Sequence, residues 1–272
     1  DDILEITEIP RKILIVGGGF IGCEFASLFS NFGSEVTIVE MMPQILPGMD
    51  KEIARKLEIL FKKKGVKVNT NADATKFNLN DFEKALVCVG RQPDTQNLNL
   101  DKLGIKTEKN KIIVDDYLRT NIPNIFAAGD CTGKIMLAHY AAYQGEVAAE
   151  NIANPDAMRK ADNSIVPNCI FTDPEIACVG INEEQAGRDV NINKFDFLGS
   201  GMARIMEETE GFIKVVSDKN TQEILGAFII GPKATELITV LALAITNRLK
   251  INQVKETIFA HPTLSESLGE AL

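Results

Sequence analysis

The stretch KILIVGGGFIGCEFASLFSNFG restricts the folds open to this 272-residue chain more than any other part of its sequence. The apolar run KILIV ends at glycines and is typical of a buried strand. A helix should follow and end near Gly33, and its apolar side chains at helical spacing are Ile21, Phe25, Leu28 and Phe29. A strand that turns through glycines into a helix begins a βαβ unit, so we expect a parallel sheet.

The next segments continue this α/β alternation. EVTIVE and VKVNT read as buried strands, and DKEIARKLEILFKKKG between them reads as an amphipathic helix that ends at Gly65. Its predicted buried stripe is Ile53, Leu57, Leu60 and Phe61. ALVCVG is a further buried strand. The pattern is looser from Gln96 to Thr120, where KIIVD is the main strand-like piece. NIFAAGDC is predicted as a strand with a glycine turn, and HYAAYQGEVAAENI as a helix.

The last third has a different order of elements. IVPNCIFTD, NKFDFLGS, GFIKVVSD and EILGAFIIG are predicted strands, with SDKNTQE as a hairpin loop. TELITVLALAITNRL and NQVKETIF are predicted helices, and Pro262 suits the first position of another. Strands followed by helices indicate an α+β domain. With a polar boundary near residues 154–163, we expect domains at 1–92, 93–158 and 159–272.

Composition excludes several classes of protein. The net charge is −9, which disfavours nucleic acid and anionic membranes as partners. Apolar stretches such as ELITVLALAIT are too short to span a bilayer, and DDILEITEIPRKI does not resemble a signal peptide. The five cysteines are odd in number and none has CxxC spacing, so we expect reduced thiols, no metal site and a cytoplasmic location.

Gly17, Gly19 and Gly22 match the pattern GxGxxG directly after a strand and at the start of a helix, with Phe20 and Ile21 between the last two glycines. Gly17 permits the tight turn, Gly19 admits a pyrophosphate to the backbone, and Gly22 lets the helix pack on the strand. The helix N-terminus would then hold the pyrophosphate. The alternative is a glycine turn that serves packing alone.

Glu40 ends the second predicted strand, where a carboxylate can accept hydrogen bonds from the adenosine ribose. A 2′-phosphate would be repelled by this charge, and no arginine follows in MMPQILP to receive it. The sequence therefore predicts NAD as the cofactor in preference to NADP.

Three other positions could carry function. Gly129 and Asp130 follow a predicted strand, where the carboxylate could bind a ligand hydroxyl or cap a helix or turn. His139 opens an alanine-rich helix and taken alone fits a structural role better. His261 and Glu266 could form a general base with an orienting carboxylate, or a surface helix cap with an unrelated glutamate.

Six stretches in this order resemble the FAD-dependent pyridine nucleotide–disulfide oxidoreductases, and among them the dihydrolipoyl dehydrogenase branch. They are IPRKILIVGGGFIGCEFASLF, VTIVE, LVCVGRQPDT, LRTNIPNIFAAGDCTGKIMLAHYAAYQGEVAAENI, FTDPEIACVG and AHPTLSESLGEAL. The resemblance implies a Rossmann-type NAD domain, a partial FAD or central domain and a dimerisation domain. It also implies NAD and FAD as cofactors, a homodimer, and dihydrolipoamide or a lipoyl domain as substrate.

The resemblance also implies roles for single residues. Asp130 would hold the FAD ribityl chain, and Phe20 would occupy the nicotinamide gate, which is usually Tyr. His261 and Glu266 would be the acid–base pair that serves redox cysteines of the other subunit. Gly90 and Arg91 would line the NAD site, and Met136, Leu137, Ala138 and His139 would border the isoalloxazine.

Two features depart from the family. The glycine-rich ADP loop for FAD and the CxxxxC redox pair are not found in this sequence. Only about fifteen residues, roughly Asn71 to Ala85, stand where the family has a three-stranded meander, which needs more chain at about five residues per strand. The meander is either deleted or missing from the sequence as given.

We therefore expect a dihydrolipoyl dehydrogenase-like chain that is poorly active alone. The alternative is a non-catalytic module that binds NAD(H) or a partner chain and forms dimers. A relative acting on glutathione or mercury fits less well, because Glu40 disfavours NADP and the HPT motif lacks a terminal cysteine pair.

Overall fold

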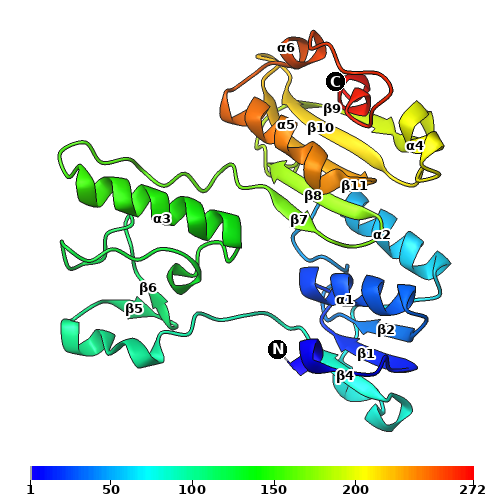
Figure 1. Ribbon diagram of the computed structural model, residues 1–272, viewed down its shortest axis with the longest axis horizontal. Coiled ribbons are helices and arrows are strands. Elements are labelled where there is room, and N and C mark those ends of the chain that lie inside the picture. Colours follow the sequence, from blue (N-terminus) through cyan, green and yellow to red (C-terminus); the bar gives the residue numbers. More distant parts are fainter. Residues whose placement is uncertain (1) are drawn as a thin grey trace. The chain divides into compact units, whose positions relative to one another are not determined.

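The computed structural model describes residues 2–272 and divides the chain into two compact units (Figure 1). The first unit combines the chain up to Gly90 with Pro167–Leu272, and the second is Arg91–Val166. The first unit thus joins a parallel sheet from the N-terminal part to an antiparallel sheet from the C-terminal part. Each unit is described separately below, and the expected limits at 92/93 and 158/159 stay a prediction.

A four-stranded parallel sheet with the strand order β3-β2-β1-β4 forms the N-terminal part of the first unit. This agrees with the predicted Rossmann-type alternation. Its strands are β1 (Lys12–Val16), β2 (Glu35–Val39), β3 (Lys67–Asn69) and β4 (Lys84–Val87), and its helices are α1 (Phe20–Asn31) and α2 (Lys51–Lys63).

The α2 helix matches its prediction. Asp50 caps its N-terminus by accepting from the amides of Glu52 and Ile53, at 3.0 and 3.2 Å. Gly65 follows the helix with φ +83°, a conformation that favours glycine. The predicted stripe of Ile53, Leu57, Leu60 and Phe61 is buried.

The apolar side chains of α1 correct the prediction in part. Ile21 and Leu28 are 40% and 43% exposed, although Phe29 is buried as expected. The buried face consists mainly of small residues, namely Gly22, Cys23, Ala26 and Ser27. Small side chains let α1 approach the sheet closely, and this requirement outweighs apolar size in choosing the buried face.

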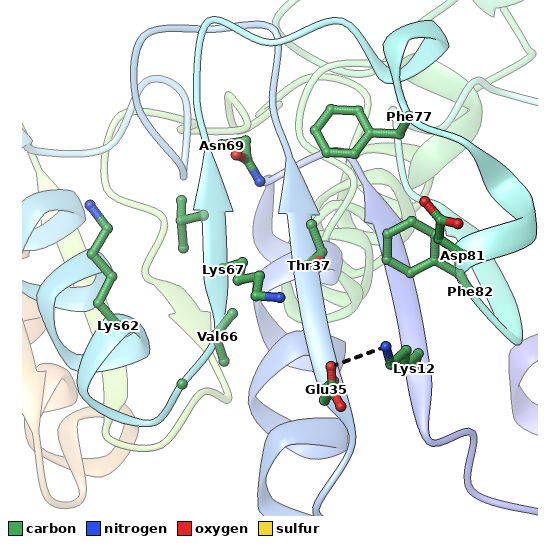
Figure 2. A pocket seen from close by; sticks show the side chains of 12 residues that line it. Lys12, Glu35, Thr37, Lys62, Val66, Lys67, Asn69, Phe77, Asp81 and Phe82 are labelled. Atoms are coloured by element: carbon green, nitrogen blue, oxygen red, sulfur yellow. Dashed lines mark ion pairs between the residues drawn. The ribbon is translucent and has the colours of Figure 1, made fainter.

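The segment between β3 and β4 passes over the strands of the parallel sheet (Figure 2). Between β3 and β4 the described chain forms no strand, only the short 3₁₀ turns Ala74–Lys76 and Leu79–Asp81. Phe77 and Phe82 from this segment line a cavity of about 640 Å³ together with Lys12, Glu35, Thr37, Lys62, Gly65, Val66, Lys67, Val68, Asn69 and Asp81. The segment is therefore too short to form the three-stranded meander that the family resemblance implies.

The C-terminal part of the first unit is an antiparallel sheet with the order β7-β8-β11-β10-β9. The sequence predicted this α+β architecture and the hairpin between β10 and β11. The elements are β7 (Asn168–Ile170), β8 (Glu175–Gly180), β9 (Val190–Asp196), β10 (Phe212–Asp218), β11 (Ile224–Gly231), α4 (Gly201–Ile205), α5 (Ala234–Thr246), α6 (Ile251–Lys255) and α7 (Glu266–Glu270).

Three details of this part differ from the prediction. The strand β8 was not predicted, because its short apolar run follows a proline and resembles a continuation of the preceding strand. The strand predicted in NKFDFLGS ends at Asp196 and is followed by a 3₁₀ turn and α4. The last helix begins at Glu266 rather than Pro262, so His261 lies in a turn before the helix.

The second unit contains α3 (Ala138–Ala153) as predicted, and a two-stranded ladder of β5 (Thr107–Glu108) and β6 (Lys111–Ile112). The strand predicted in NIFAAGDC is wrong, since only an isolated bridge joins Arg119 and Phe126. A strand needs a neighbour with which to pair, and this unit offers little beyond that bridge.

The remaining 3₁₀ turns of the chain are Asp2–Glu5, Gln96–Leu98, Leu100–Leu103, Asp130–Thr132 and Phe197–Gly199. Within residues 2–272, no helix has the length and apolar character needed to cross a membrane.

One continuous core joins the two sheets of the first unit. Buried residues of β1, β2, α1 and α2 pack in the same cluster as Ile170, Ile176, Val216, Phe228 and Ile230 of the antiparallel sheet. Ion pairs surround this core: Lys56 and Lys63 of α2 both contact Glu210, at 2.6 and 2.8 Å. The parallel sheet is therefore held against the C-terminal part by apolar packing and by charge.

These ion pairs predict a loss of stability in acid. Hydrogen bonds from Lys56 and Lys63 lower the pKa of Glu210 below its usual 4.5. A carboxylate whose pKa is lowered by folding stabilises the fold above its unfolded pKa, and this contribution disappears as the pH falls through the folded value. We expect the urea concentration at the unfolding midpoint to decrease as the pH is lowered from about 5 to about 3. In the double variant Lys56→Met, Lys63→Met this decrease should be smaller. Identical acid profiles for the two proteins would contradict this assignment.

Candidate nucleotide site and acid–base pair

The glycine turn between β1 and α1 has the geometry of a dinucleotide loop. Gly17 has φ +105°, and a Cβ placed there would lie 2.4 Å from the carbonyl oxygen of Cys88. A Cβ on Gly22 would lie 2.0 Å from the carbonyl oxygen of Gly17. A Cβ on Gly19, in contrast, would meet no atom within 4 Å. Gly17 and Gly22 are therefore required by packing, whereas Gly19 borders open space.

The N-terminus of α1 faces this open space without a side-chain cap. Its N-cap residue is Gly19, which has no side chain with which to cap the helix. The first amides of a helix have no partner within the helix and carry a partial positive charge, so this terminus suits a phosphate group. The residues of the turn fit the pyrophosphate of a dinucleotide.

Glu40 lies beside this turn and is buried, with 8% of its surface exposed. Its Oε2 accepts from the amide of Gly18 at 2.7 Å, and its Oε1 accepts from the amide of Met42 at 2.8 Å. Each carboxylate oxygen has a second lone pair left, which can accept from a ligand hydroxyl. The sequence could not reveal that Glu40 also holds the glycine turn in place.

Of the other residues predicted to line the nucleotide site, two adjoin the glycine turn in sequence and two lie near residue 90. Phe20 and Ile21 open α1, where Phe20 packs against the core and Ile21 is exposed. Gly90 is the last residue of the N-terminal segment of the first unit, with φ +121° and open space at its Cβ position. Arg91 is the first residue of the second unit.

The residues predicted to contact FAD lie together in the second unit. Gly129 donates its amide to Oε1 of the fully buried Gln144 at 2.7 Å, and Asp130 is exposed at the start of a 3₁₀ turn. Met136 is also exposed, Leu137 is the N-cap residue of α3 without a side-chain hydrogen bond, and Ala138 and His139 begin that helix. Nε2 of Gln144 is buried without a partner. The exposed carboxylate of Asp130 and the exposed Met136 fit part of a flavin site.

His261 and Glu266 are in contact at the C-terminal end. Nδ1 of His261 lies 2.8 Å from Oε1 of Glu266, and 80% of the imidazole side chain is exposed. The amide of Thr263 donates to Oε2 of Glu266 at 2.9 Å. This amide and, next, His261 hold the pKa of Glu266 below its usual value. A carboxylate that stays ionised beside Nδ1 favours the tautomer in which Nε2 is free to accept a proton.

Thr263 is the residue of this group that the sequence analysis missed. Its hydroxyl donates to the carbonyl of Ala260 at 2.7 Å while its amide holds Glu266. The signal was available, because a threonine two residues after a histidine in a proline turn can form such a local hydrogen bond. His261 and Glu266 themselves come together as predicted, although the helix cap does not form.

Two family models match the chain. The model described as "Pyridine nucleotide-disulphide oxidoreductase" matches residues 1–145, and that described as "Pyridine nucleotide-disulphide oxidoreductase, dimerisation domain" matches residues 166–272. Together they cover almost the whole sequence.

Curated relatives agree with these matches. A dihydrolipoyl dehydrogenase of Chlamydia muridarum is 41% identical, with 99% of this chain and 61% of the relative covered. One from Bacillus subtilis is 39% identical, with 100% and 62% covered. This chain thus spans about 61% of the relatives' length. The alignment to the Chlamydia muridarum protein extends over 286 positions, more than the 272 residues here, so that relative has residues within the matched region that this chain lacks.

Solved structures are similar over the same range. The HOCl-induced flavoprotein disulfide reductase RclA from Escherichia coli has a TM-score of 0.90 at 30% identity, with 99% of this chain and 66% of that one covered. LpdA from Mycobacterium tuberculosis has a TM-score of 0.89 at 30% identity, with 98% and 62% covered. The parallel sheet followed by the antiparallel sheet is therefore the arrangement found in these solved structures.

Proposed function

Because the chain belongs to the pyridine nucleotide–disulphide oxidoreductases, we propose that it is the NAD-binding and dimerisation part of a dihydrolipoyl dehydrogenase. In this reaction a dihydrolipoyl dithiol is oxidised to a disulfide and NAD is reduced to NADH. The substrate is dihydrolipoamide or a lipoyl domain. The proposal includes a cytoplasmic location, which the pattern of unpaired cysteines supports.

The glycine turn with its buried glutamate carries the proposal. Gly19 leaves room for a pyrophosphate at the N-terminus of α1, and Glu40 has lone pairs to receive ribose hydroxyls beside it. A 2′-phosphate would meet the same carboxylate at close range and would be repelled. NAD(H) is therefore the cofactor proposed for this site. Phe20 and Gly90 would border its nicotinamide half.

His261 and Glu266 would move a proton during thiol chemistry. Nε2 of His261 would accept the proton of a thiol, which leaves a thiolate able to attack a disulfide. The resulting imidazolium would stay paired with Glu266, which already contacts Nδ1 at 2.8 Å. Asp130 and the residues at the start of α3 would hold part of FAD, and this group would supply the electron transfer between the dithiol and NAD.

A homodimer is part of this proposal, and the match of residues 166–272 to a dimerisation domain supports it. Two protomers related by a two-fold axis would each present the same surface. His261 would then serve cysteines contributed by the partner subunit.

Binding of NADH can be tested directly with this chain. The sequence contains no tryptophan, so NADH fluorescence can be followed with little protein background. We expect NADH to bind weakly and at least tenfold more tightly than NADPH, because Glu40 would repel the 2′-phosphate. The purified chain should retain little FAD and show little lipoamide activity. A yellow protein that reduces NAD with dihydrolipoamide would contradict the expectation that the chain alone holds little FAD and has little activity. Equal affinities for NADH and NADPH would contradict the proposed role of Glu40.

The second candidate is a non-catalytic module that binds NAD(H) or a partner chain and forms dimers. The observation that favours it is the coverage of only about 61% of the relatives' length. Mixing this chain with a separately expressed FAD-binding polypeptide distinguishes the two candidates. Recovery of lipoamide activity supports the dehydrogenase, whereas a stable dimer that binds NADH without gaining activity supports the module.

A further inference from the structure

The loop of residues 41–50 connects Glu40 to the α2 helix and forms one wall of the glycine turn. Leu46 in its middle is fully buried, has φ +50°, and donates its amide to the carbonyl of Gly18 at 2.7 Å. Positive φ is uncommon for a side chain of this size and persists only where surrounding contacts impose it. The contact between Leu46 and Gly18 is therefore maintained by the packing and hydrogen bonds around the loop.

This contact determines how the peptide between Gly18 and Gly19 is oriented. The carbonyl and the amide hydrogen of a trans peptide point in opposite directions. Since the carbonyl of Gly18 points toward Leu46, the amide of Gly19 points away from the loop. The Cβ position of Gly19 is open, so a ligand can approach this residue. A displacement of the loop would rotate this peptide and redirect the amide.

The far end of the loop is held by Lys214 of β10, which is fully buried. Its Nζ lies 2.7 Å from Oδ2 of Asp50, 2.7 Å from Glu183 and 3.2 Å from Glu52. Burial by itself lowers the pKa of Lys214, but its bonds to Asp50 and Glu183 outweigh this and raise it, so the lysine stays charged. Asp50 uses its other oxygen to cap α2.

The outer side of the loop has little packing behind it. A cavity of about 300 Å³ separates it from the segment after β8, and residues Met42–Gln44 and Pro47–Glu52 line one side while Asn182–Gln185 line the other. Asp50, Glu52 and Glu183 border this cavity, and Lys214 contacts all three from within the protein. Lys214 is therefore the buried cation that neutralises Asp50 at the end of the loop.

We infer that Lys214 is a positioning residue for the dinucleotide, and that it acts through Asp50 and the 41–50 loop on the Gly18–Gly19 peptide. The inference rests on the proposed NAD(H) binding. It means that the C-terminal dimerisation part contributes to cofactor affinity without touching the cofactor. Loss of Lys214 removes the contact that holds Asp50 at the end of the loop, and in the single variant it also leaves three carboxylates close together whose repulsion would displace the loop further.

The test is an NADH fluorescence titration of Lys214→Met at a temperature well below its unfolding midpoint. We expect the NADH affinity to fall about tenfold or more, with a reduced preference for NADH over NADPH because Glu40 is displaced together with the loop. Lys214→Arg should restore most of the affinity. The matched control is Lys51→Met, which removes an exposed lysine paired with Glu184 across the same cavity and should change the affinity less than twofold.

A second variant covers the possibility that Lys214→Met does not fold. Asp50→Asn with Lys214→Met removes both buried charges, and asparagine is still a good N-cap. We expect its unfolding midpoint to be close to that of the wild-type protein while its NADH affinity stays reduced. A folded variant of either kind that binds NADH within twofold of wild type would overturn the inference. Failure of the wild-type chain itself to bind NADH would instead overturn the proposed function.

Discussion

Gly22→Ala is expected to destabilise the first unit by about 3 kcal/mol, which corresponds to a fall of about 10 °C in its unfolding midpoint. The added Cβ would lie 2.0 Å from the carbonyl oxygen of Gly17, and this oxygen belongs to backbone that cannot rotate away. Relief would require α1 to move off β1, which would open the core around Cys23 and Ala26. Thermal unfolding followed by circular dichroism measures the change.

Gly19→Ala is the matched comparison for this variant. Its φ of −73° is ordinary for alanine, and the new methyl group would meet no protein atom within 4 Å. We expect its unfolding midpoint to stay close to that of the wild-type protein, while its NADH affinity falls at least tenfold because the methyl group would occupy the path of the pyrophosphate. An NADH affinity of Gly19→Ala equal to that of the wild-type protein would instead show that the turn serves packing alone.

The pattern of apolar residues was sufficient to predict α2 but not the packing of α1. In α2 a single stripe is apolar and the opposite face is charged, so only one orientation can bury the stripe. In α1 nearly every face is apolar, and the sequence alone does not say which face meets the sheet. The close approach at Gly22 decides it, and that approach depends on the three-dimensional position of Gly17.

The sequence predicted which residues belong to the candidate site, but not most of the contacts that those residues make. The spacing of Glu40 from the glycines indicated a ribose ligand, but its bonds to the amides of Gly18 and Met42 could not be read from spacing. The role of Lys214 could not be predicted from the sequence for a similar reason. It lies on a strand 164 residues from Asp50, and a lone lysine in an apolar strand gives no sign of its partners. Long-range partners of this kind require the fold.

The acid–base pair gives the second large expected effect, on the tautomer of His261. With Glu266 ionised, the neutral imidazole should carry its proton on Nδ1 and leave Nε2 free. Glu266→Ala removes the charged acceptor of the Nδ1 proton, so the tautomer ratio should shift about tenfold toward Nε2–H. Nitrogen-15 NMR of the imidazole rings measures this ratio, and with two histidines in the chain the spectrum can be assigned by the variant His261→Gln.

Glu270→Ala is the control, because Glu270 is an exposed residue of the same helix and forms no hydrogen bond or ion pair with His261. It should leave the ring nitrogens of His261 unchanged, and the signals of His139 should stay constant in both variants. In a mixture with an FAD-binding polypeptide that restores activity, His261→Gln should lower the lipoamide rate by about 10²–10⁴-fold, the range expected for loss of a general base. If the tautomer ratio of His261 is the same in Glu266→Ala as in the wild-type protein, the contact with Glu266 plays no part in proton transfer. Only a carboxylate that directs the proton to Nδ1 can leave Nε2 free to act as the base.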